Sequence, residues 1–130
     1  MRDLALAFKA AGDPTRLRIL KLLERGGLCV CQVQAVLGLA PSTVSKHLTI
    51  LKRAGLVDDQ RDGKWIEYSL ATTSRTPHVR PLLDLLRATP SEDTVLSADR
   101  RRLREVTRVP KTDLQRLAAP TRRAAVRGGR

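Results

Sequence analysis

Aromatic side chains are scarce in this sequence, because Phe8, Trp65 and Tyr68 are the only three among 130 residues. Leucine, valine, isoleucine and alanine must therefore fill any core, which favours packed helices. Long apolar runs are also missing, and none approaches the roughly 20 residues needed to cross a membrane. The first residues lack a signal-peptide pattern. We therefore expect a soluble, cytoplasmic protein with no membrane partner.

Cysteine is nearly absent, with only Cys29 and Cys31 in the chain. Two cysteines with one residue between them cannot link distant parts of a fold, which excludes a secreted disulfide scaffold. In the cytoplasm we expect both thiols to be reduced. A disulfide across a single residue would be strained, although a redox role for the pair stays open.

Acidic residues are outnumbered, with 13 Asp and Glu against 25 Lys and Arg, a net charge of +12 and a pI near 11.2. Such an excess attracts polyanions through the release of phosphate counterions. The excess is uneven: 14 basic and 10 acidic residues precede Ser97, whereas 11 and 3 lie from Ser97 onward. We predict a domain over 1–90 and a basic, partly disordered tail over 91–130, with a helix near 98–106.

Helical periodicity dominates the first half of the chain. The spacing predicts a helix over 3–11, and Asp13 followed by Pro14 is a strong signal for the start of the next helix, which Gly26 and Gly27 end. A short helix is expected from about Cys29 to Leu37, and another from Pro41 to Ala54 with Val44, Leu48 and Leu51 as its apolar stripe. A short helix, a turn and a second helix with a polar leading edge form a helix-turn-helix.

From Leu56 onward the spacing of apolar residues changes from the helical period to one typical of strands. Leu56–Val57 and Trp65–Leu70 read as two strands around a polar segment, in which Asp62-Gly63 is a favoured hairpin dipeptide. A hairpin directly after a helix-turn-helix is a wing. The very apolar helix predicted over 77–88 indicates a subunit interface. The fold class is therefore mainly α, a winged helix-turn-helix with a two-stranded wing.

Four segments resemble the ArsR/SmtB family of metal-sensing repressors: residues 8–20, 41–48, 51–57 and 61–70. The likeness runs in unbroken order from about residue 4 to 88 and does not extend to the tail. It implies a homodimer, held by the first and last helices of the domain, that binds an inverted-repeat operator in double-stranded DNA.

Candidate DNA contacts lie on the second helix of the helix-turn-helix and on the wing. Polar residues at the leading end of that helix suit the major groove, and basic residues further on suit phosphates, although each is also compatible with an ordinary solvated surface. Ser42 is equally compatible with a helix cap. The candidates are Ser42, Thr43, Ser45, Lys46, His47, Lys52, Arg53, Arg61 and Lys64.

The two cysteines are the candidate metal ligands, since a helix N-terminus favours thiolates and two thiolates can chelate a soft centre. The resemblance places Cys29-Val30-Cys31 where the arsenite-, antimonite- and cadmium/lead-responsive members carry the same motif. Some arsenic sensors have a third cysteine at the position of Gln34. Without it, arsenite would keep a water or hydroxide, or the inducer would need only two sulfurs, as a singly substituted organoarsenical such as methylarsenite does.

The resulting hypothesis is a repressor released from its operator when Cys29 and Cys31 bind As(III), Sb(III) or an organoarsenical, with no permanently bound cofactor. Alternatives are a regulator of the same fold that responds to cadmium, lead or oxidants, and a basic protein that binds nucleic acid without sequence preference. An enzyme is not expected, because no catalytic set of residues is recognisable. His78 with Asp84 provides too few ligands for a zinc site, so we interpret His78 as a surface or interface residue.

Overall fold

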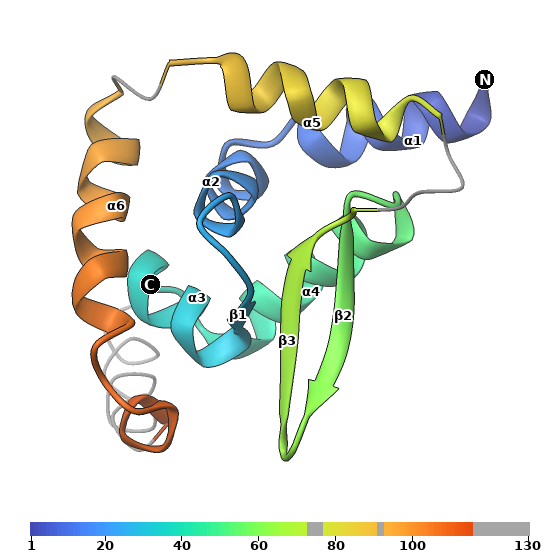
Figure 1. Ribbon diagram of the computed structural model, residues 1–130. Coiled ribbons are helices and arrows are strands. Elements are labelled where there is room, and N and C mark those ends of the chain that lie inside the picture. Colours follow the sequence, from blue (N-terminus) through green and yellow to red (C-terminus); the bar gives the residue numbers. More distant parts are fainter. Residues whose placement is uncertain (73–76, 91–92, 116–130) are drawn as a thin grey trace, which may run out of the picture.

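The computed structural model describes residues 1–72, 77–90 and 93–115, and these residues form a winged helix (Figure 1). In chain order the elements are α1 (Arg2–Ala11), α2 (Pro14–Leu23), β1 (Leu28–Cys29), α3 (Val30–Leu37), α4 (Pro41–Arg53), β2 (Val57–Asp62), β3 (Trp65–Leu70), α5 (Val79–Ala88) and α6 (Thr94–Val106). No helix among these residues is long and apolar enough to span a membrane.

Helices α2 and α4 begin where the sequence predicts, but their caps differ. The Asp13 side chain accepts a hydrogen bond of 3.1 Å from Arg16 N, with Pro14 in the first turn of α2. This is the side-chain cap that the Asp-Pro pair predicts. In α4 the N-cap is Ala40 and Pro41 opens the helix. The capping role considered for Ser42 is therefore wrong, because Ser42 already lies inside the first turn.

The wing belongs to a three-stranded antiparallel sheet with the order β1-β3-β2, rather than to a two-stranded hairpin. The additional strand pairs Leu28 with Tyr68 and Cys29 with Glu67. An added Cβ at Gly27 would lie 2.5 Å from Glu67 Cδ, so a larger residue there would have to displace the Glu67 side chain. Strand β1 thus connects the cysteine pair directly to the wing.

The hairpin turn consists of Gly63 and Lys64, since Asp62 pairs with Trp65. Gly63 has a φ of 63°, and no non-glycine residue in the described ranges has a positive φ. A positive φ at the first central position alone is the type II′ pattern, whose twist matches that of the flanking strands. The turn is therefore one residue later than the Asp62-Gly63 dipeptide suggests.

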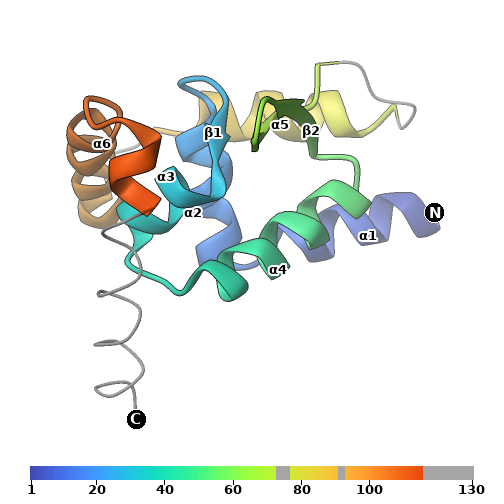
Figure 2. The same cartoon turned by 90° about the horizontal axis from the view of Figure 1, so that it is seen from below.

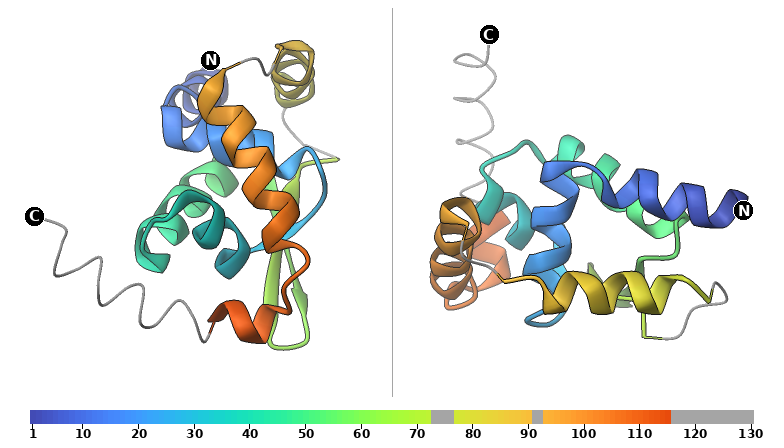
Figure 3. Two further views of the ribbon diagram at one scale, coloured as in Figure 1. Left: turned by 90° about the vertical axis from the view of Figure 1, so that its left-hand side faces the viewer. Right: turned by 90° about the horizontal axis from the view of Figure 1, so that it is seen from above.

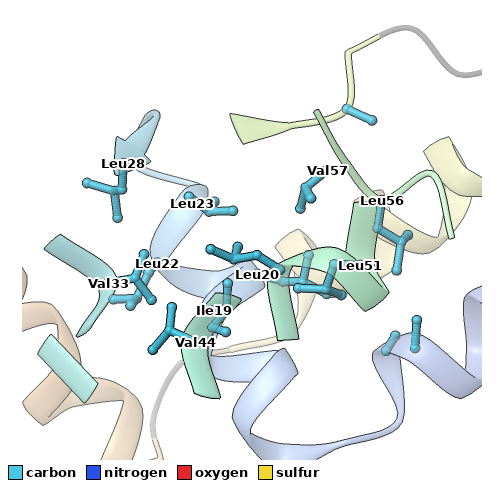
Figure 4. Packing of buried hydrophobic residues seen from close by; sticks show 14 of the residues in the cluster. Ile19, Leu20, Leu22, Leu23, Leu28, Val33, Val44, Leu51, Leu56 and Val57 are labelled. Carbon is cyan, nitrogen blue, oxygen red and sulfur yellow. The ribbon is translucent and has the colours of Figure 1, made fainter. Parts of the chain in front are cut away.

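The core lies where α2, α3 and α4 meet the base of the sheet (Figure 4). Ile19 of α2 and the predicted stripe of α4, Val44, Leu48 and Leu51, are all fully buried. Leu56 and Val57 extend this core toward the wing. Aliphatic side chains thus fill the centre, as the shortage of aromatic residues requires.

Helices α1 and α5 lie along one edge of the molecule (Figures 1 and 3). Several of their apolar side chains are exposed. Val79 and Leu83 hold α5 on the core, whereas Leu85 is 64% exposed and Phe8 of α1 is 57% exposed. Helix α5 begins at Val79, two residues later than the predicted Pro77.

Helix α6 begins at Thr94, four residues before the predicted start, and packs across α2 and α3 (Figure 3). Its Asp99 is buried and accepts hydrogen bonds of 2.8 and 2.9 Å from Nε and Nη2 of Arg18. These bonds raise the pKa of Arg18 above its ordinary value. Arg102 Nη1 also donates to Val36 O at the end of α3, at 3.3 Å. The domain boundary near residue 90 stays a prediction, and residues 116–130 of the predicted basic tail lie outside the described part of the chain.

The Arg18–Asp99 pair gives a first testable prediction. Asp99→Asn removes the negative charge from a site that is 2% exposed and leaves the Arg18 guanidinium without its counterion. Hydrogen bonds to charged groups contribute about 1.5–3 kcal/mol, so we expect a loss of that order in the free energy of unfolding, measured with urea. Asp84→Asn is the matched control, because the Arg80–Asp84 pair is exposed and should contribute under about 1 kcal/mol. Equal losses in the two variants would contradict the prediction.

Candidate nucleic-acid interface and thiol site

The polar face of α4 is the first candidate surface. Ser42, Thr43, Ser45 and Lys46 are exposed, whereas the apolar stripe of the same helix faces the core. The view in Figure 2 shows α4 along one side of the molecule, with α5 across from it. A helix anchored on one face and polar on the other has the form that a major groove accepts.

His47 is half-buried and held by Arg16, a contact that the sequence does not reveal. Arg16 Nη1 lies 3.2 Å from His47 Nδ1, and Arg16 Nε donates to Ala10 O at 2.6 Å. A guanidinium has only donors, so Nδ1 must accept and the imidazole proton must lie on Nε2. Arg16 therefore joins the end of α1 to α4 and leaves Nε2 of His47 as a donor.

The basic candidates further along the chain are exposed, but three of them already have partners. Lys52 Nζ lies 2.9 Å from Asp59 Oδ2, and this hydrogen bond raises the pKa of Lys52 above its ordinary value. Lys64 Nζ lies 5.0 Å from the centre of the Trp65 ring, at cation–π distance. Arg61 Nη1 donates to Gly63 O at 3.5 Å. Arg53 is exposed at the last position of α4.

The cysteine pair lies at the junction of β1 and α3. Cys29 is the N-cap of α3 and is 2% exposed, and Cys31 is half-buried in the first helical turn. Gln32 Oε1 accepts a hydrogen bond of 3.0 Å from Cys29 N, which fixes the start of the helix. The prediction that both cysteines lie at a helix N-terminus is therefore confirmed.

The structure joins the two sulfurs in a disulfide, which corrects our expectation of two separate thiols. Cys29 is extended and Val30 is the first helical residue, and the helical backbone at Val30 sets the two flanking Cα atoms 5.5 Å apart, within the usual range for a disulfide. A disulfide has no thiolate to offer to a metal. The oxidised and reduced pairs are therefore chemically different states of this site.

A pocket of about 550 Å³ opens beside the cysteines, and α4 and the wing line its other sides. Gln34, at the position where a third sulfur would stand, is buried and lines this pocket. Within 1–72, 77–90 and 93–115, no group of three or more His, Cys, Asp and Glu side chains is placed to hold a metal ion. His78 is half-buried directly before α5, away from the pocket lining.

An exposed polar helix beside a β-hairpin wing defines the class of DNA-binding, winged helix-turn-helix transcriptional regulators. The model of the bacterial regulatory protein, arsR family, matches residues 13–59. An uncharacterized HTH-type transcriptional regulator of Methanocaldococcus jannaschii is 46% identical over 80 residues, which cover 61% of this chain and 89% of that protein. The chain belongs to the arsR family of regulatory proteins. It is thus a transcriptional regulator and not an enzyme, as the sequence predicts.

Two further comparisons refine the resemblance. The arsenical resistance operon repressor of Escherichia coli is 41% identical over 73 residues, which cover 55% of this chain and 58% of that repressor. The solution structure of a homodimeric winged helix-turn-helix DNA-binding domain from Mycobacterium bovis matches with a TM-score of 0.58 and 31% identity, over 66% of this chain and 76% of that one.

Proposed function

We propose that this protein binds an inverted-repeat operator as a homodimer and is released when reduced Cys29 and Cys31 bind a trivalent metalloid. The observation that carries the proposal is the position of the two sulfurs, at the start of α3 and directly beside the surfaces of α4 and the wing. Arsenite, antimonite and methylarsenite are the candidate inducers.

DNA binding is proposed for the exposed face of α4 and for the wing. Ser42, Thr43, Ser45 and Lys46 would reach base edges, and Nε2 of His47 would donate to a base or a phosphate. Arg53, Arg61 and Lys64 would contact phosphates. Lys52 would have to exchange its bond with Asp59 for a phosphate oxygen, so we expect it to contribute less.

The dimer is proposed to form through α1 and α5. Leu6, Phe8 and Leu85 are exposed on these helices, and a second copy would remove their apolar surface from water. A two-fold axis through such an interface presents two copies of α4, which matches a palindromic operator. The homodimeric state of the Mycobacterium bovis domain supports a dimer for this chain.

Metalloid binding is proposed for the reduced pair, because thiolates are the ligands that soft metalloids prefer. The partial positive charge of a helix N-terminus favours the thiolate form of both cysteines. With two sulfurs and no third cysteine in the chain, the site suits an inducer whose third bond goes to oxygen or carbon.

The structural path from the cysteine pair to the proposed DNA-binding elements, α4 and the wing, is short. Movement of Cys29 acts on the wing through the β1–β3 pairing, and movement of α3 acts on α4, which packs against it. A coupling free energy of about 1–3 kcal/mol lowers operator affinity roughly 5- to 150-fold. Binding at the cysteines would thus shift both DNA-contacting elements.

The proposal is tested by measuring operator binding through the fluorescence anisotropy of a labelled inverted-repeat DNA fragment, taken from the region upstream of the gene for this protein. The protein is reduced with a phosphine, desalted without oxygen, bound to the fragment and titrated with arsenite and methylarsenite. Release in the concentration range of thiol binding supports the proposal, and binding that neither compound alters overturns the metalloid part. A peroxide titration tests the second candidate, release by oxidants, which the disulfide favours.

A charge variant tests the assignment of α4 to the DNA. Lys46→Ala is expected to weaken operator binding by roughly 5- to 150-fold, the effect of losing one bidentate base contact worth about 1–3 kcal/mol. Arg101→Ala is the control, because it removes the same charge from an exposed position on α6, outside the surfaces proposed for DNA binding and dimerisation. An equal loss in both variants would mean that binding depends on net charge alone, and would favour nucleic-acid binding without sequence preference.

A further inference from the structure

The pocket beside the cysteines is apolar over most of its lining, and two of the chain's three aromatic residues lie there. Its walls are Val30 beside the cysteines, Pro41 at the start of α4, and Trp65, Ile66 and Tyr68 on β3. Its volume of about 550 Å³ is typical of pockets for small organic ligands. Two thiols alone do not require such a cavity.

We propose that this pocket receives the carbon substituent of a singly substituted trivalent organoarsenical, and that an aromatic substituent fits it best. The inference rests on the proposed function and names the ligand class of the same site. Two thiols of the reduced pair react with R–As(OH)₂ to form two As–S bonds and release two waters. Arsenic stays trivalent and its As–C bond is kept, so the third sulfur that is absent at Gln34 is not needed. Where the pair is oxidised, a thiol or phosphine reductant must first supply two electrons and two protons.

The size and chemistry of the pocket argue for a carbon substituent over a third oxygen. Inorganic arsenite would place a hydroxyl group toward Trp65, Ile66 and Tyr68 and would leave most of the cavity empty. An aryl ring would remove the apolar faces of these residues from water, and an aromatic pair gains further from offset or edge-to-face contact. The pocket should therefore rank ligands by their organic group.

An occupant of this pocket would also touch the proposed DNA-binding elements. Ser45 of α4 and Lys64 of the wing both line the cavity, and Lys64 lies over the ring of Trp65. A ring bound against Trp65 would compete with Lys64 for that face. Larger substituents should therefore release DNA at lower concentrations than arsenite does.

Trp65 is the only tryptophan in the chain, so its emission reports directly on the pocket. The full-length, reduced protein is titrated with phenylarsenous acid, methylarsenous acid and arsenite, and the adducts are counted by intact-mass spectrometry. We expect half-saturation by the phenyl compound at about 10- to 100-fold lower concentration than by the methyl compound, the range that extra carbon in an apolar pocket provides. Release of operator DNA should follow the same order.

Two isoleucine variants with matched exposure test the assignment to this pocket. Ile66 is 39% exposed and lines the cavity, whereas Ile50 is 38% exposed on α4 and is not part of its lining. Ile66→Ala should reduce the ratio of the half-saturating concentrations of the methyl and phenyl compounds by at least about threefold. Trp65→Ala should reduce the same ratio, measured by counting adducts by mass because this variant has no tryptophan emission. Circular dichroism checks that both variants fold. Ile50→Ala should keep the wild-type ratio.

Two outcomes would overturn the inference in distinguishable ways. If all three compounds bind the cysteines with equal half-saturation, the pocket does not select the substituent, while the proposed metalloid sensing stands. If none of them forms a cysteine adduct or releases DNA, the proposed metalloid function fails together with this inference.

Discussion

Replacing both cysteines with serine is expected to give a protein that binds its operator like the wild type but is no longer released by arsenite or methylarsenite. Serine hydroxyls are not deprotonated near neutral pH and are poor ligands for soft metalloids. The 5- to 150-fold change in operator affinity expected for the wild type should therefore shrink to none. Anisotropy titrations of both proteins on the same fragment measure this difference.

We expect the double serine variant to fold like the wild type, so a loss of release would report on inducer binding and not on folding. Cys29 is the N-cap of α3, and serine is among the best residues at that position. Cys31 is half-buried and close to serine in size. Ala35→Ser on the exposed face of α3 is the control and should keep full release. If the double variant were still released at wild-type inducer concentrations, the proposed site would be wrong.

Local signals in the sequence predict most of the scaffold. Each of these signals involves only residues that are close in the sequence, so it needs no tertiary information. The Asp13-Pro14 pair identifies the start of α2. The apolar stripe of Val44, Leu48 and Leu51 identifies α4. The position of the cysteines at a helix start follows from the same kind of signal. The residues proposed to contact DNA stay predictions.

The features that sequence reasoning missed depend on contacts between distant segments. Strand β1 has only two residues, too few for any alternation, and it exists because β3 pairs with it. Arg16 and His47 are 31 residues apart, and Arg18 and Asp99 are 81 apart. Asp99 stands in an arginine-rich run that resembles a solvated tail. Only the packing of α6 on α2 and α3 shows that its carboxylate is buried.

The disulfide illustrates a different limit of sequence reasoning. A bridge across one residue requires a particular backbone bend, and no local pattern in the sequence indicates such a bend at Cys29. The bend arises because the residue ends β1 and caps α3 at once. The same geometry holds both sulfurs on one side of the chain, which is the arrangement that a shared arsenic atom needs after reduction.

Leu48→Ala should cause a large loss of stability, because it truncates a fully buried side chain of α4. Leu48 is fully buried and, with Val44 and Leu51, anchors α4 on the core. Truncation of a buried leucine costs about 2–5 kcal/mol through lost burial and the cavity left behind. In a domain of this size that corresponds to a drop in Tm of roughly 10–20 °C. Circular dichroism melts at one fixed protein concentration measure the drop, since dimerisation makes Tm depend on concentration.

The control for this prediction is Ile50→Ala, on the same helix and two residues away. Ile50 is 38% exposed, so its truncation removes less buried surface than that of Leu48 and should cost only about 1 kcal/mol. Operator affinity measured well below both transitions should be similar in the two variants, because neither side chain is among the proposed DNA contacts. A Leu48→Ala loss no larger than that of Ile50→Ala would mean that α4 is not anchored through this stripe. A movement of α3 at the cysteines could then not be transmitted to the DNA-binding face through a firmly anchored α4.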